Sequence, residues 1–166
     1  GGFQIHEGDS ENHYTYVDID AELLDWASRY FGVNKEEVNL IAKDARAYLV
    51  GNHSKWDAIV LDVFNSADNI PAHLMTLEFF SLIKSRLGHD GLFIANTVTS
   101  GGFRDKLSQN LYNTIHAAFP FCQVQQTLAG NESQLNNVVY TCFSHQGDKG
   151  LYRDDKRARH SDFTKT

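Results

Sequence analysis

The chain has 166 residues, of which 42% are hydrophobic and 22% are charged, and its formal net charge is −6. This length and composition predict one globular domain and exclude disorder as the main state. The negative charge argues against a nucleic-acid partner, and the longest apolar runs, Ala58–Leu61 and Leu92–Ala95, are too short to span a membrane. We find no secretory leader and no disulfide framework for Cys122 and Cys142, so we expect reduced thiols in the core of a cytoplasmic protein.

From Tyr14 onward, strand signals alternate with helix signals. The β-branched and aromatic run Tyr14–Val17 predicts a strand, and apolar residues at helical spacing between Leu23 and Phe31 predict a helix. We expect Asp20 to cap this helix and Gly32 to end it. The next expected elements are a short buried strand at Val38–Ala42, a helix at Ala45–Val50 capped by Asp44, and an apolar strand at Ala58–Leu61 that ends at Asp62.

The second half of the chain continues this alternation. The expected elements are a helix at Met75–Leu87, a turn at Gly88–Gly91, a strand at Leu92–Val98, a helix around Phe103–Ile115, and two strands at Phe121–Thr127 and Leu135–Phe143. Only a short loop, around Ala129–Glu132, separates the last two strands. Parallel neighbours need a long crossover connection, so we expect these two strands to be antiparallel.

Helices placed between strands predict right-handed βαβ units and a mostly parallel sheet. We therefore predict an α/β fold of the class I methyltransferase-like type, with a doubly wound, Rossmann-like, mostly parallel sheet and an antiparallel C-terminal strand pair. No segment before Tyr14 predicts a first strand, so that strand is expected to be missing. We assign residues 1–143 to this Rossmann-like domain, which we expect to be N-terminally truncated, and residues 144–166 to a mildly basic tail.

Acidic residues follow three predicted strands, at the edge where sheets of this kind bind ligands. Asp18 can accept hydrogen bonds from ribose hydroxyls, or it is a solvated turn residue. Asp44 can accept the exocyclic amine of an adenine, or it only caps a helix, and the two roles can coexist. Asp62 can bind a cationic amine or take a proton from it, or it caps a loop. The same rule singles out Asn96, near the end of the strand expected at Leu92–Val98.

Other kinds of chemistry have less support. The eight histidines are scattered, with no HxH or HExxH spacing, so we predict no metal site. No GxSxG nucleophile motif is present. Asn65 lies in a polar loop directly after Asp62, and this loop could cover a ligand.

Several segments together resemble the spermidine synthase family. They are Tyr16–Asp20 (YVDID), Tyr30–Gly32 (YFG), Lys43–Leu49 (KDARAYL) and Trp56–Phe64 (WDAIVLDVF), followed at the family's spacing by Ile70–Leu74 and Arg86–Gly91. The likeness covers roughly residues 14–143. It is nearer to the spermidine synthase-like proteins than to the proven polyamine enzymes.

The resemblance implies a class I S-adenosylmethionine-dependent methyltransferase fold that binds S-adenosylmethionine or its decarboxylated form as a substrate. It places the ribose on Asp18 and the adenine near Asp44 and Ala45. It also implies that Asp62 helps to deprotonate the amine of putrescine, which then displaces methylthioadenosine from decarboxylated S-adenosylmethionine. Catalysis would come from positioning, proton removal and carboxylates around the cationic amine.

Departures from the family pattern leave the reaction open. Asn65 stands where the family has a second acid, and an asparagine cannot balance the charge of a diamine. Gly1 and Gly2 resemble the end of the family's glycine-rich nucleoside loop, or they are a tag remnant, and the N-terminal hairpin domain of the family is not found. We expect a transferase that binds a nucleoside and an amine, with homodimerisation as a family-level expectation. The alternatives are a small-molecule methyltransferase and a non-catalytic paralogue.

Overall fold

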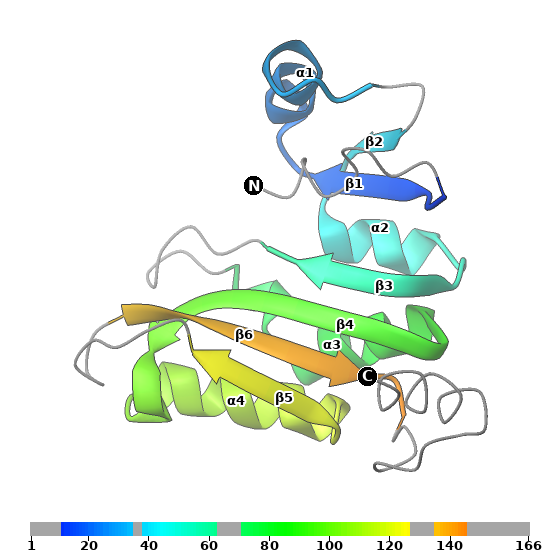
Figure 1. Cartoon of the computed structure of the whole chain (residues 1–166). Helices are drawn as coiled ribbons and strands as arrows, with labels where there is room; N and C mark the ends of the chain where they lie inside the picture. Colours follow the sequence, from blue (N-terminus) through cyan, green and yellow to red (C-terminus); the bar gives the residue numbers. More distant parts are fainter. Residues whose placement is uncertain (1–10, 35–37, 63–70, 127–134, 146–166) are drawn as a thin grey trace, which may run out of the picture.

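The computed structural model describes residues 11–34, 38–62, 71–126 and 135–145 (Figure 1). Its elements are β1 (Tyr14–Asp18), α1 (Ala21–Tyr30), β2 (Val38–Ala42), α2 (Ala45–Gly51), β3 (Trp56–Leu61), the 3₁₀ turn η2 (Ala72–Leu74), α3 (Leu77–Arg86), β4 (Leu87–Ser100), the 3₁₀ turn η3 (Gly101–Phe103), α4 (Lys106–Ala118), β5 (Cys122–Gln126) and β6 (Leu135–Phe143). Among these described helices, none combines the length and the apolar character needed to cross a membrane. Most of the predicted tail, residues 146–166, lies outside the described residues.

Hydrogen bonds divide the described strands into two sheets. β1 and β2 form a parallel pair, and the other strands form a sheet in the order β3-β4-β6-β5. β3 and β4 are parallel, whereas β6 is antiparallel to both β4 and β5. The mixed α/β architecture and the antiparallel C-terminal pair are therefore confirmed. A doubly wound sheet has the strand order 3-2-1-4-5, in which β2 and β1 take places 3 and 2 and β3 and β4 take places 4 and 5. The break between β1 and β3 therefore falls at place 1, the strand for which the sequence shows no signal.

One face of the four-stranded sheet forms the main core against α3 and α4 (Figure 1). Alternate residues of β4, including Phe93 and Ala95, are fully buried on this face. The ring of Phe93 stacks on Phe119 with centroids 5.1 Å apart and lies 6.0 Å from the ring of Phe80. Burial of each such side chain contributes about 1.5–3 kcal/mol, so these rings are a main source of the sheet's stability.

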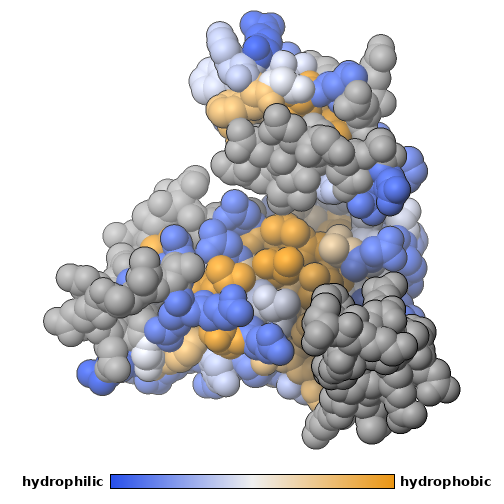
Figure 2. All heavy atoms as spheres, viewed as in Figure 1, coloured by the Kyte–Doolittle hydropathy of each residue, from blue (hydrophilic) through white to orange (hydrophobic). Residues whose placement is uncertain are grey.

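Side chains on the opposite face of this sheet are more exposed. Val60 is 49% exposed and Phe143 is 40% exposed. The strand register places Val60 beside Ile94 and Phe143 opposite Leu92, so all four lie on this face. Figure 2 shows apolar residues gathered there, over β3 and β4. This exposure follows because the described helices α3 and α4 cover only the other face.

The helix ends follow the predicted capping chemistry. The Asp20 carboxylate accepts hydrogen bonds from two backbone amides at the start of α1, and Gly32 adopts the left-handed conformation (φ +67°) just after that helix. The helix expected at Met75–Leu87 is α3, which begins at Leu77 and ends at Arg86. Thr76 caps it, because its hydroxyl accepts a hydrogen bond from the Phe79 amide.

The two cysteines form a disulfide bond, so the prediction of reduced thiols is wrong. Cys122 and Cys142 are directly opposite each other in the antiparallel pair of β5 and β6, with Cα atoms 4.0 Å apart. They are separated by 20 positions in the sequence. Only the register of the two strands brings the sulfur atoms together, and this register is not visible in the spacing of the cysteines.

Reduction of the Cys122–Cys142 disulfide should destabilise the protein. The bond closes a loop of about 20 residues, and loops of this size correspond to about 3 kcal/mol through the lower entropy of the unfolded chain. Urea denaturation with and without reductant, together with the Cys122→Ser/Cys142→Ser double variant, measures this difference. Thiol labelling of the unfolded, unreduced protein should find both cysteines blocked, and labelling of both would contradict the disulfide.

Candidate functional site

The carboxyl ends of the parallel strands bring the predicted acidic residues to one edge of the fold (Figure 1). Asp18, the last residue of β1, pairs with Ala42 at the end of β2. The Lys43 amide then donates a hydrogen bond to the Asp18 carbonyl over 2.8 Å. Asp44 directly follows Lys43 in the chain. The carboxylates of Asp18 and Asp44 therefore lie on neighbouring segments, at the end of β1 and just after the end of β2.

Asp18 is held in a local turn. Its Oδ1 accepts a hydrogen bond from the Asp20 amide over 2.8 Å, which is the turn role that the sequence left as an alternative. This bond orients the carboxylate at the strand end. A role in binding ribose stays a prediction, since one carboxylate can accept hydrogen bonds at both of its oxygens.

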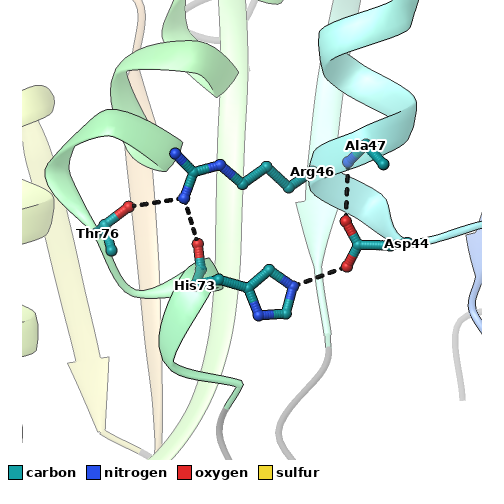
Figure 3. Close-up of polar contacts among 5 residues, drawn as sticks. All are labelled: Asp44, Arg46, Ala47, His73 and Thr76. Carbon is teal, nitrogen blue, oxygen red and sulfur yellow. Dashed lines mark hydrogen bonds and ion pairs between the residues drawn. The ribbon is translucent and has the colours of Figure 1, made fainter.

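Both oxygens of the Asp44 carboxylate have partners (Figure 3). Oδ1 accepts a hydrogen bond from the Ala47 amide over 2.8 Å and caps α2, as predicted. Oδ2 lies 2.7 Å from Nε2 of His73, which comes from the 3₁₀ turn η2. An adenine amine would therefore have to share Oδ2 with His73 or replace it.

These contacts lower the pKa of Asp44. Partial burial raises the pKa of the carboxyl, but the hydrogen bond from His73, the Ala47 amide and the charge of His73 together outweigh burial and bring the pKa below its ordinary value of 3.8. The carboxyl is thus ionised at neutral pH and can accept hydrogen bonds from a ligand.

Arg46 also holds the segment that contains His73 (Figure 3). Its guanidinium donates a hydrogen bond to the His73 carbonyl over 2.9 Å and contacts the Thr76 hydroxyl at 3.3 Å. Together, Asp44 and Arg46 fasten the segment before α3 to the start of α2. The sequence-based predictions assign no role to Arg46, His73 or Thr76. The Thr-Leu-Glu pattern before an apolar run indicates the Thr76 cap, but no local signal connects His73 to a residue 29 positions earlier.

Asp62 follows β3 and is exposed at the same edge. The side-chain amide of Asn96 on the neighbouring strand β4 donates a hydrogen bond to Asp62 Oδ1 over 3.1 Å. The parallel register explains this contact, because Leu61 pairs with Ala95 and the next residue of each strand is Asp62 and Asn96. The amide orients the carboxylate, and its second oxygen can accept a proton or bind a cation.

The remaining predicted site residues have different outcomes. Ala45 is the first residue of α2 and packs against the main core. Its position beside Asp44 is compatible with the predicted adenine contact, which stays a prediction. Gly1, Gly2 and Asn65 lie outside the described residues.

Residues 3–146 match the family model of the spermine/spermidine synthase domain. The chain belongs to the spermine/spermidine synthase family. The resemblance inferred from the sequence segments is therefore confirmed.

Sequence relatives of this spermine/spermidine synthase family member are named polyamine aminopropyltransferases. The protein of Vibrio vulnificus with this name is 34% identical over 133 residues, which are 78% of this chain and 44% of that protein. This chain spans less than half the length of the curated polyamine aminopropyltransferases that it matches.

Two solved structures confirm the predicted methyltransferase-like fold. Human methyltransferase-like protein 13 in complex with SAH has a TM-score of 0.66 and 21% identity, over 89% of this chain and 67% of that one. A spermidine synthase in complex with the transition-state analogue AdoDATO has a TM-score of 0.61 and 16% identity, over 87% of this chain and 56% of that one.

Replacing Asp44 should change the acid stability of this family member. Since the pKa of Asp44 is depressed in the folded state, its ionised form stabilises the protein above about pH 4, and this stabilisation is lost as pH falls through the folded-state pKa below 3.8. Asp44→Asn keeps a good helix cap but loses the charge, so its stability should fall less on acidification from about pH 6 to about pH 3.

Asp44→Ala also removes the cap and should cost about 1 kcal/mol further at neutral pH. Urea denaturation at both pH values measures these effects. Identical acid sensitivity in the wild type and Asp44→Asn would contradict the assignment of the shifted carboxyl.

Proposed function

We propose that this protein is an aminopropyltransferase-like enzyme that binds a nucleoside of the S-adenosylmethionine type. The observation on which the proposal rests is the Asn96-oriented carboxylate of Asp62, which ends β3 at the same edge as Asp18 and Asp44. Family membership supports it, as do relatives named polyamine aminopropyltransferases. The AdoDATO complex of a similarly folded spermidine synthase is consistent with it.

Decarboxylated S-adenosylmethionine is the proposed donor. Asp18 accepts hydrogen bonds from the ribose hydroxyls, and the start of α2 at Asp44 and Ala45 receives the adenine. The sulfonium then projects toward Asp62. Gly1 and Gly2 belong to the proposed nucleoside loop, and Asn65 is proposed to contact the acceptor.

Asp62 is the proposed general base. Its carboxylate attracts the protonated amine and removes a proton, so that the nitrogen lone pair becomes available. The nitrogen attacks the carbon next to the sulfonium, a C–N bond forms, and the C–S bond breaks with its electron pair on sulfur. Methylthioadenosine leaves as a neutral thioether. Most of the acceleration is expected from alignment of the amine with the C–S bond.

Methyl transfer is the alternative reaction proposed for the site at the carboxyl ends of the strands. Asn65 favours it, because the family's second acid would be needed to balance a diamine. S-adenosylmethionine would then bind in place of its decarboxylated form, and the acceptor would be a small molecule. A non-catalytic paralogue would keep the fold without turnover.

Two further expectations stay predictions. Homodimerisation is proposed only from the family. The cytoplasmic location no longer has the support of free thiols, because Cys122 and Cys142 are paired and disulfides persist mainly in oxidising compartments.

Asp62→Asn tests the base assignment. The variant keeps the shape of the side chain but cannot accept a proton, so turnover with putrescine should fall about 100-fold to 10,000-fold while nucleoside binding persists. Steady-state kinetics and calorimetry with decarboxylated S-adenosylmethionine measure the two effects. Asp57→Asn is the matched control, since Asp57 is an exposed acid near the start of β3 and away from the carboxyl edge. Normal turnover in Asp62→Asn would contradict the assignment.

The choice of nucleoside separates the three functions. Tighter calorimetric binding of decarboxylated S-adenosylmethionine, with turnover of putrescine, is the expected result. Preference for S-adenosylmethionine would favour methyl transfer. Failure to bind either nucleoside would contradict both enzymatic functions and favour the non-catalytic paralogue.

A further inference from the structure

Two histidines and an aspartate meet at the amino end of β4, which is the end of the main sheet away from Asp62. β4 pairs with β3 through Leu87 and again from Leu92, so residues 88–91 bulge out between these pairs. His89 and Asp90 lie in this bulge. β6 ends opposite Leu92, and the following residues reach the bulge, where the Ser144 amide donates a hydrogen bond to the Gly91 carbonyl over 3.0 Å.

A tight backbone turn holds the bulge in place. A Cβ atom on Gly91 would lie 2.7 Å from Cβ of Leu87 and 3.0 Å from the Gly88 nitrogen, so only glycine fits there. The next residue after Ser144 is His145, and its ring centroid lies 4.0 Å from that of His89. The side chains of His89, Asp90 and His145 therefore meet on a constrained backbone.

The distances from the Asp90 carboxylate to the two histidine rings match those between adjacent metal ligands. Nδ1 of His89 and Nε2 of His145 each lie 3.3 Å from Oδ1 of Asp90, and all three ligand atoms lie within 4.8 Å of one another. A tetrahedral zinc ion with bonds of about 2.0–2.1 Å would hold adjacent ligand atoms about 3.3 Å apart. A charge-assisted hydrogen bond between imidazolium and carboxylate would be shorter, at about 2.7–2.9 Å.

Hydrogen bonding at Ser144 determines which nitrogen of His145 carries the proton. The Ser144 hydroxyl donates its one proton to the His89 carbonyl. Oγ of Ser144 must then accept from Nδ1–H of His145, which lies 3.2 Å away. In the neutral ring, Nε2 consequently presents its lone pair to the Asp90 carboxylate, and these two acceptors face each other without an intervening proton. A shared cation removes this repulsion.

We propose that His89, Asp90 and His145 bind a divalent transition metal ion, with Zn²⁺ as the best match. Two imidazoles and one carboxylate suit zinc, whereas Mg²⁺ and Ca²⁺ prefer oxygen ligands alone. Ser144 orients His145 from behind, as residues around metal-binding histidines commonly do. The side chains are 84%, 90% and 39% exposed, respectively, so water can occupy the remaining position.

The proposed ion would join two segments that are far apart in the chain. It would fasten the segment after β6 to the bulge of β4, at the end of the sheet away from the Asp62–Asn96 pair. The sequence predicts no metal site because His89 and His145 are far apart in the chain and match no ligand spacing.

Calorimetric titration of metal-free protein without a histidine tag tests this proposal. Zn²⁺ should bind with one equivalent and raise the melting temperature, and Mg²⁺ should do neither. His145→Ala and Asp90→Asn should each weaken zinc binding about tenfold or more, and Ser144→Ala should weaken it about 10-fold to 100-fold. Melting of each variant without metal shows whether it is folded.

His53→Ala is the matched control, because His53 is an exposed histidine outside the cluster. It should bind zinc as the wild type does. Absence of saturable zinc binding would overturn the proposal, as would an equal loss in His53→Ala and His145→Ala. Nitrogen NMR of the metal-free protein should find the His145 proton on Nδ1, and a neutral ring with its proton on Nε2 would overturn the argument from Ser144.

Discussion

The pairing of β4 on both sides is the constraint on which most of this structure depends. β4 is parallel to β3 and antiparallel to β6, and one of its faces buries the aromatic core against α3 and α4. A shift of one residue in either register would turn Phe93 away from that core. The buried face therefore defines the register, and the register in turn places the side chains at both ends of the strand.

The carboxyl edge shows how this constraint positions chemistry. Asn96 reaches Asp62 because their strands are in parallel register, and the amide orients a carboxylate that is otherwise exposed. At the neighbouring helix α2, Arg46 and Asp44 hold the segment containing His73. In the proposed function, an adenine that approaches Asp44 meets a carboxylate whose Oδ2 is already hydrogen-bonded to His73, so the proposed nucleoside binding would be coupled to the position of this segment.

The contacts at the other end of the main sheet, away from Asp62, depend on β6. Its register with β5 brings Cys142 to Cys122, and its register with β4 brings His145 to the bulge with His89 and Asp90. Both contacts join residues that are distant in sequence. The disulfide strengthens the end of the sheet that does not carry the proposed active site, and the proposed metal ion would strengthen the same end.

The sequence by itself determined the order of elements, the caps at Asp20 and Asp44 and the strand ends that carry Asp18 and Asp62, because these features depend on local periodicity and short-range hydrogen bonding. Its segments also indicated the family. Only the tertiary structure decided which distant residues meet: His73 with Asp44, Cys122 with Cys142, and His145 with Asp90. The same holds for the exposure of Val60, which depends on which face the helices cover. Strand register and helix placement are properties of the packed core, and no local pattern in the chain encodes them.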